Sequence, residues 1–163
     1  MPLPENFRPM LIVAVFCVMW PAMGRTELIG EVDTAFRWLG KDDRVIVEAY
    51  DDPKVRGITC FVSRARTGGF KGTVGVAEDR AEASIACRQI GETLHFTEKL
   101  PQQEDVFTER MSLLFKRLHI VRIVDHKRNT LIYLTYSDRV IEGSPQNTVT
   151  AVPVPHTTII PVK

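Results

Sequence analysis

The sequence is short of cysteine, of net charge and of long apolar runs, and each shortage excludes a class of protein. Its 163 residues include three cysteines, none in a CxxC or Cys/His ligand spacing, so a redox-active pair or a zinc site has no support. Lysine and arginine number 21 against 20 aspartate and glutamate, which gives no case for nucleic-acid binding, since that needs a basic patch. Beyond residue 24 no apolar run approaches the length of a membrane-spanning helix, about 18 residues. We therefore expect no stable membrane span after that point.

The N-terminal segment has the pattern of an export signal. Arg8 is the only base before the apolar run Met10–Trp20, whose 11 residues would span about 16 Å as a helix and cannot cross a ~30 Å hydrocarbon layer. Pro21 ends this run, and Ala22-Met23-Gly24 places small residues where signal peptidase requires them. We expect cleavage after Gly24, which makes residues 1–24 a leader and residues 25–163 one disulfide-linked domain in the periplasm. A short membrane anchor and a buried core helix are the alternatives.

Two cysteines, Cys60 and Cys87, remain after such cleavage. The third, Cys17, lies in the leader, and the bulky Phe16 before it does not suit lipoprotein processing. Two thiols of one small domain are expected to pair in an oxidising compartment, so we predict a Cys60–Cys87 disulfide between two strands. It would close a loop of about 28 residues and stabilise the fold by roughly 3.6 kcal/mol, because it restricts the unfolded chain.

Short β-branched segments separated by turn residues predict a mainly β fold. Residues 91–104 are expected to be irregular, and Met111–Val124 fits both a helical stripe and a strand; we assign it as strand from Leu114. The other expected strands are Arg44–Tyr50, Gly57–Arg66, Ser84–Ile90, Thr130–Ser137 and Asn147–Val154, with looser alternation over Glu27–Leu39. The expected architecture is an antiparallel sandwich or a partly closed barrel with little helix, and α+β is the alternative.

No catalytic, cofactor or metal motif is found in the sequence. The glycine-rich segment Thr67–Gly75 holds four of the ten glycines, but it lacks the spacing of a phosphate-binding loop. No nucleophile elbow, Ser-x-x-Lys motif or pair of histidines at helical spacing occurs. Charged residues near the glycine-rich segment and in the first sharp turn are the candidates for ligand binding: Arg64, Arg66, Lys71, Asp51 and Asp52. A solvated strand end and a solvated turn explain these residues equally well.

Several segments resemble the CreA family of bacterial envelope proteins. They are Gly30–Thr34, Val47–Pro53, Thr59–Ala65 with Thr67-Gly68-Gly69, Ala83–Gln89, Lys127–Asn129, Tyr136–Asp138 and Glu142–Pro145, within about residues 28–154. The resemblance implies an exported or periplasmic protein that carries the two matching cysteines, encoded in some bacteria beside a carbon-source-responsive two-component system. It implies no reaction.

The function expected from these observations is that of a non-catalytic binding or accessory protein of the envelope. Its partner would be an unknown envelope protein or a small ligand, with no nucleic acid and no cofactor. The alternative is an enzyme whose unrecognised site lies near the glycine-rich segment, residues 67–75. A pocket in which a carboxylate or histidine converges with Arg64 or Lys71 would favour that alternative.

Overall fold

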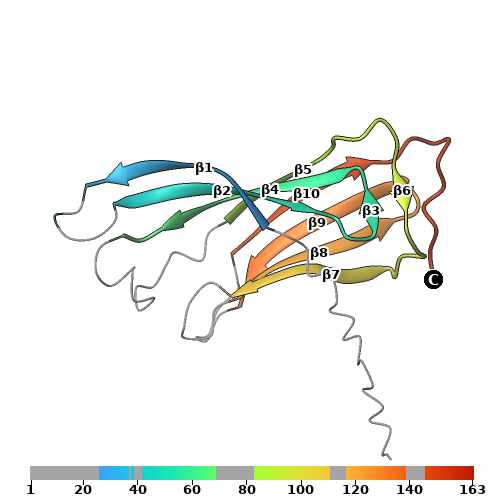
Figure 1. Ribbon diagram of the computed structural model, residues 1–163. Helices are drawn as coiled ribbons and strands as arrows, with labels where there is room; N and C mark the ends of the chain where they lie inside the picture. Colours follow the sequence, from blue (N-terminus) through green and yellow to red (C-terminus); the bar gives the residue numbers. More distant parts are fainter. Residues whose placement is uncertain (1–25, 37, 39–41, 69–82, 111–116, 139–145) are drawn as a thin grey trace, which may run out of the picture.

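The computed structural model describes residues 26–36, 38, 42–68, 83–110, 117–138 and 146–163, and these ranges contain strands and loops but no helix (Figure 1). The strands are β1 (Thr26–Ala35), β2 (Asp43–Asp51), β3 (Val55–Arg56), β4 (Ile58–Arg66), β5 (Ala83–Gln89), β6 (His95–Phe96), β7 (Gln103–Arg110), β8 (Arg117–Asp125), β9 (Thr130–Ser137) and β10 (Asn147–Pro153). The described ranges therefore hold no helix that could span a membrane. Three segments discussed above lie outside the described ranges: the predicted leader (residues 1–24), residues 69–75 with Lys71, and residues 111–116.

Two four-stranded antiparallel sheets form the fold. The first has the strand order β1-β2-β4-β5 and the second β10-β9-β8-β7, while β3 and β6 pair in a small separate sheet. The strand β5 lies beside β10, but the bonds between them come from side chains: the Thr148 hydroxyl donates to the Ala83 carbonyl at 3.0 Å and the Thr150 hydroxyl accepts from the Cys87 N–H at 3.4 Å. The sheets therefore form a sandwich that is not closed into a barrel. The mainly β, antiparallel prediction is confirmed.

Strand boundaries follow the sequence pattern closely, with one segment as an exception. Residues 91–104 were expected to be irregular, yet they contain β6 and the start of β7. The prediction of an irregular segment is therefore wrong at β6 and at the start of β7. Strand β7 was missed because it has few apolar residues and its inward positions include Glu104 and Glu109, which pair with buried arginines. Buried charges remove the alternation by which a half-buried strand is recognised.

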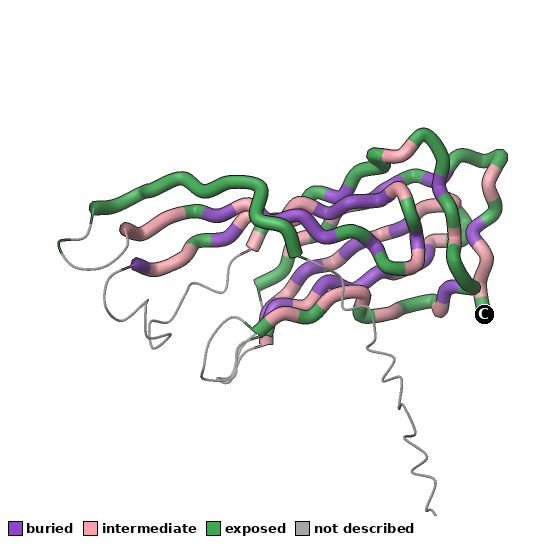
Figure 2. Tube along the Cα trace, viewed as in Figure 1, coloured by how far each residue is buried: buried purple, intermediate pink, exposed green. Residues whose placement is uncertain are grey.

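The core lies between the two sheets and is built mainly from alternate residues of β4, β8 and β9, with single buried residues of β2, β3, β5 and β10 and none of β1 (Figure 2). On β4 the buried apolar face is the one that alternation predicts, Ile58, Cys60 and Val62. Cys60 lies directly opposite Cys87 of β5, and the two form the predicted disulfide. Their exposed fractions are 3 % and 0 %, so the bond is shielded from solvent.

The turn between β3 and β4 requires a glycine. Gly57 has a φ of +97°, a conformation that residues with a Cβ rarely adopt. A Cβ at this position would lie 2.7 Å from the Thr93 carbonyl oxygen, because the backbone of residues 91–93 packs against the turn. This close approach holds the segment that leads into β6 against the end of the first sheet.

Candidate functional site

Each large sheet contributes one fully buried arginine to the space between the sheets. Arg64 comes from β4 and Arg122 from β8, and both side chains have an exposed fraction of 0 %. Each guanidinium contacts two carboxylates and lies near one buried tyrosine that bonds to a carboxylate of the same group. We name these groups the Arg64 cluster (Arg64, Glu48, Glu109 and Tyr50) and the Arg122 cluster (Arg122, Asp52, Glu104 and Tyr133).

The central carboxylate of the Arg122 cluster is saturated, although the Arg122 Nε is buried without an acceptor in the described part of the chain. Asp52 accepts from the Arg122 Nη1 at 2.6 and 2.7 Å and from the Tyr133 hydroxyl at 2.7 Å. The backbone N–H groups of Lys54 and Val55 donate to the same carboxylate at 2.8 and 3.0 Å. Because Asp52 directly follows β2 of the first sheet and Arg122 belongs to the second sheet, the cluster holds the two sheets together. Its geometry is that of a structural ion pair.

The Arg64 cluster joins the sheets at Glu48 and Tyr50 of β2, which precede Asp52 in the chain. The Arg64 Nη2 donates to Glu109 of β7 at 2.6 Å and also contacts Glu48 of β2. The Tyr50 hydroxyl donates to the same Glu109 oxygen at 3.1 Å and to Glu48 at 3.3 Å. The Arg64 Nε and Nη1 atoms, although buried, have no acceptor in the described part of the chain. A buried donor without an acceptor costs about 1–3 kcal/mol, so this guanidinium has unused binding capacity.

The electrostatics of both clusters keep protons on the tyrosines. Burial raises the pKa of Tyr50 far above its usual range, and the charges of Glu109 and Glu48 raise it further against the opposing charge of Arg64. Burial, with the charge of Asp52, raises the pKa of Tyr133 in the same way. Both phenols therefore act as hydrogen-bond donors at neutral pH.

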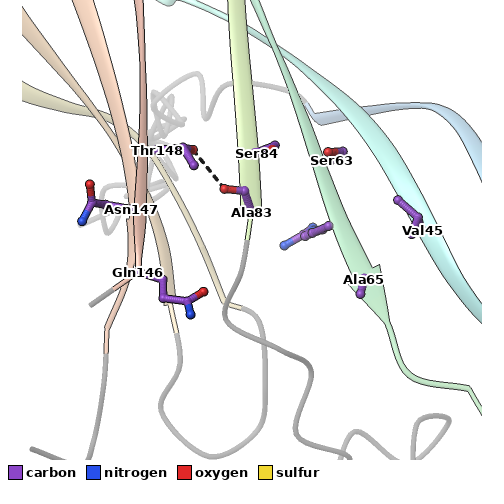
Figure 3. Close-up of a pocket in the computed structure, with 9 residues that line it drawn as sticks. Val45, Ser63, Ala65, Ala83, Ser84, Gln146, Asn147 and Thr148 are labelled. Atoms are coloured by element: carbon purple, nitrogen blue, oxygen red, sulfur yellow. Dashed lines mark hydrogen bonds between the residues drawn. The ribbon is translucent and has the colours of Figure 1, made fainter. Parts of the chain in front are cut away.

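Two pockets open beside the Arg64 cluster. The larger, about 460 Å³, lies where β4 and β5 approach β10 and is lined by Arg64 and polar side chains that include Ser63, Ser84, Gln146 and Asn147 (Figure 3). The smaller, about 280 Å³, lies against β1 and β2 and is lined by Glu48 among others. Its remaining lining residues are Leu28, Glu31, Arg44, Ile46, Arg66 and Thr67. The Arg64 cluster thus borders both pockets, through Arg64 at the larger one and through Glu48 at the smaller one.

The five candidate residues from the sequence fall in different places. Arg64 and Arg66 lie on one face of β4, and Arg66 approaches Glu109 at 3.5 Å. Asp51 is exposed near the other end of β2, where it accepts from the Thr59 hydroxyl at 2.6 Å. Asp52 is held in the Arg122 cluster. Lys71 lies outside the described residues. The structure therefore brings Arg64 and Arg66 together and separates them from both aspartates.

Glu48, Glu109 and Tyr50 were not identified from the sequence as site residues. A signal for Glu48 was present, since it shares the inward face of β2 with Ile46 and Tyr50. The same face of β4 continues from Val62 to Arg64. A carboxylate and a base on adjoining apolar faces indicate a buried ion pair. Glu109 carries no comparable signal, because its strand was not predicted.

A second polar group lies on the outer face of the second sheet, around His119. Its Nε2 lies 3.1 Å from Asp138, its Nδ1 lies 3.4 Å from the Thr108 hydroxyl, and its ring stacks on Tyr136 with centroids 4.9 Å apart. Burial, with the nearby aspartates, raises the pKa of Tyr136. Neither pocket beside the Arg64 cluster includes these residues. Within the described ranges no group of three or more potential ligands is placed to hold a metal ion.

The fold and site define a class, an antiparallel β-sandwich with a buried cross-strand disulfide and cross-sheet arginine clusters. The profile of the CreA protein family matches residues 29–157. Protein CreA of Escherichia coli (strain K12) is 48 % identical over 148 residues, which cover 88 % of this chain and 94 % of that protein. Protein CreA of Escherichia coli O157:H7 matches to the same extent. No solved structure matches the chain. The chain belongs to the CreA family, a family of unknown function.

Proposed function

We propose that the protein is exported to the periplasm and works there as a binding protein without catalysis of its own. The leader pattern of residues 1–24 and the buried Cys60–Cys87 disulfide support export, since such bonds persist in oxidising compartments. The ligand we propose is a small polar molecule with an anionic or other acceptor group, bound in the larger pocket.

The observation that carries this proposal is the buried Arg64 guanidinium with two unused donors at the wall of the 460 Å³ pocket. The pocket adds hydroxyl and amide groups from β4, β5 and β10, which suit a polar ligand better than an apolar one. The Arg64 side chain has an exposed fraction of 0 %, so an acceptor would reach Nε or Nη1 only after neighbouring side chains shift. The ligand would then satisfy donors that are otherwise buried without partners.

The same geometry favours binding over proton transfer. Glu48 and Glu109 are both held by Arg64, and Tyr50 keeps its proton because its pKa is raised. A catalytic acid or base needs a pKa near the working pH and a free path to the substrate. Catalysis here would require one carboxylate to leave Arg64, which would leave a buried charge unpaired.

The test is the thermal stability of the purified protein with three probes at equal ionic strength: inorganic phosphate, citrate and glucose. A ligand at ten times its dissociation constant stabilises by about 1.4 kcal/mol, or about 5 °C for a domain of this size. We expect at least one probe to raise Tm, and Ser84→Trp, which fills the pocket from an exposed position, to abolish the increase. The matched control is Ala86→Trp, exposed on the same strand but outside the pocket lining. Equal responses of the two variants, or no response to any probe, would contradict the proposal.

A further inference from the structure

The first strand of the first sheet contributes nothing to the core. All ten residues of β1 are exposed, and among the described strands β1 pairs with β2 alone, so no described strand lies along its other edge (Figures 1 and 2). The strand and the residues that follow it carry large apolar side chains: Leu28, Ile29, Val32, Phe36 and Trp38. Trp38 is 94 % exposed. A free strand edge with apolar side chains of this size marks an interaction surface.

Proteins commonly protect such edges with lysine, proline or a covering loop. Strand β1 contains neither lysine nor proline, and its register against β2 shifts between Leu28 and Gly30 and again between Asp33 and Ala35. These irregularities fall near the two ends, so the stretch from Gly30 to Asp33 remains regular. Its N–H and C=O groups are suited to pair with one more strand.

The charges of β1 indicate which side chains a strand paired with its outer edge should carry. The strand has three acidic residues, Glu27, Glu31 and Asp33, and no basic residue. Arg44 of β2 lies opposite Asp33 and pairs with Glu31 at 3.1 Å, so one base of the neighbouring strand faces two of the three carboxylates. A second copy of β1 would bring six carboxylates to one edge, where like charges are destabilising. A segment with lysine or arginine between apolar residues would complement the edge.

We propose that β1 is a docking edge for an extended segment of another polypeptide, in which basic residues alternate with apolar ones. The segment adds to the first sheet as a fifth strand beside β1. Its backbone pairs with the outer edge, its basic side chains lie near Glu31 and Asp33, which share one face of β1, and its end packs against Phe36 and Trp38. This inference rests on the exposed edge and does not depend on the Arg64 pocket.

The experiment uses fluorescence of Trp38 in the full chain carrying Trp20→Phe, in which Trp38 is the only tryptophan. The probe is a synthetic peptide of alternating lysine and valine, about eight residues long to match a typical strand. We expect a saturable blue shift of the emission, weakened by salt. An alternating glutamate–valine peptide should leave the emission unchanged. Equal shifts with both peptides, or none with the lysine peptide, would overturn the proposal.

A pair of variants distinguishes binding of the peptide at this edge from non-specific binding elsewhere on the surface. Val32→Lys places a base on the face of β1 opposite to Glu31 and Asp33, among the valines of the bound peptide. It should weaken binding of the lysine–valine peptide by about tenfold or more, because an apolar contact is lost and a positive charge is added to the edge. Val149→Lys on β10 is the control, since the two valines are exposed to 68 % and 63 %. Unequal folding of the two variants would show in their circular dichroism. If sedimentation shows a dimer that Val32→Lys dissociates, a second copy occupies the edge and the proposed partner is wrong.

Discussion

Removing the Cys60–Cys87 disulfide should lower the free energy of unfolding by about 3.6 kcal/mol. The two cysteines are 27 positions apart, so the bond closes a loop of about 28 residues in the unfolded chain. For a domain of about 139 residues the entropy of unfolding is about 0.29 kcal/mol per degree, so the loss corresponds to about 12 °C in Tm. Both cysteines are buried, and the double variant Cys60→Ala/Cys87→Ala avoids leaving a reactive thiol.

The assay is urea unfolding of wild type and double variant, each with and without reductant. Without reductant we expect a difference of about 3.6 kcal/mol from the crosslink, plus about 1–2 kcal/mol from the lost sulfur atoms. With reductant present throughout unfolding and refolding, only the smaller contribution of about 1–2 kcal/mol should remain. Cys17→Ala is the control and should have no effect, because we expect Cys17 to leave with the leader. Equal stability of wild type and double variant without reductant would refute the reasoning.

Three further predictions follow from other buried groups. Burial raises the pKa values of Tyr50 and Tyr133 far above their usual range, so neither should titrate near pH 10 by ultraviolet absorbance in the folded protein. Stability is kept below about pH 10 and falls above it by about 1.4 kcal/mol per pH unit for each of these two tyrosines. Gly57→Ala should destabilise by about 1–3 kcal/mol in urea unfolding, and Gly30→Ala, which meets no atom within 4 Å, should not. Asp52→Asn should cost about 3 kcal/mol or more because Arg122 loses the fully buried one of its two carboxylate partners, whereas Asp51→Asn at an exposed site should cost less than about 1 kcal/mol.

Strands with one apolar and one polar face were predictable from the sequence. The range Thr130–Ser137 is β9 as predicted. Strand β4 differs from its predicted range by one residue at its start, and β2 and β5 differ by one residue at each end. These strands are rich in β-branched and aromatic residues, and each is bounded by turn residues, so local preference and burial agree. The disulfide pairing followed from the number of cysteines rather than from any local pattern.

The candidate site was less predictable, because it depends on contacts between sheets. Arg64 was identified from its position near the glycine-rich segment, while its main acceptor, Glu109, lies 45 positions away on a strand that was not predicted. Asp51 and Asp52 are adjacent in sequence, yet one faces solvent and the other is buried. Strand alternation places them on opposite sides, and only the packing of the second sheet shows which side is covered.

The central claim is that the chain crosses the inner membrane, loses residues 1–24 and then forms its disulfide. The most direct test is the intact mass of the protein released from the periplasm of cells that express the full chain. The account predicts the mass of residues 25–163 less two hydrogens. A mass that includes the leader, or that of a fully reduced chain, would contradict it.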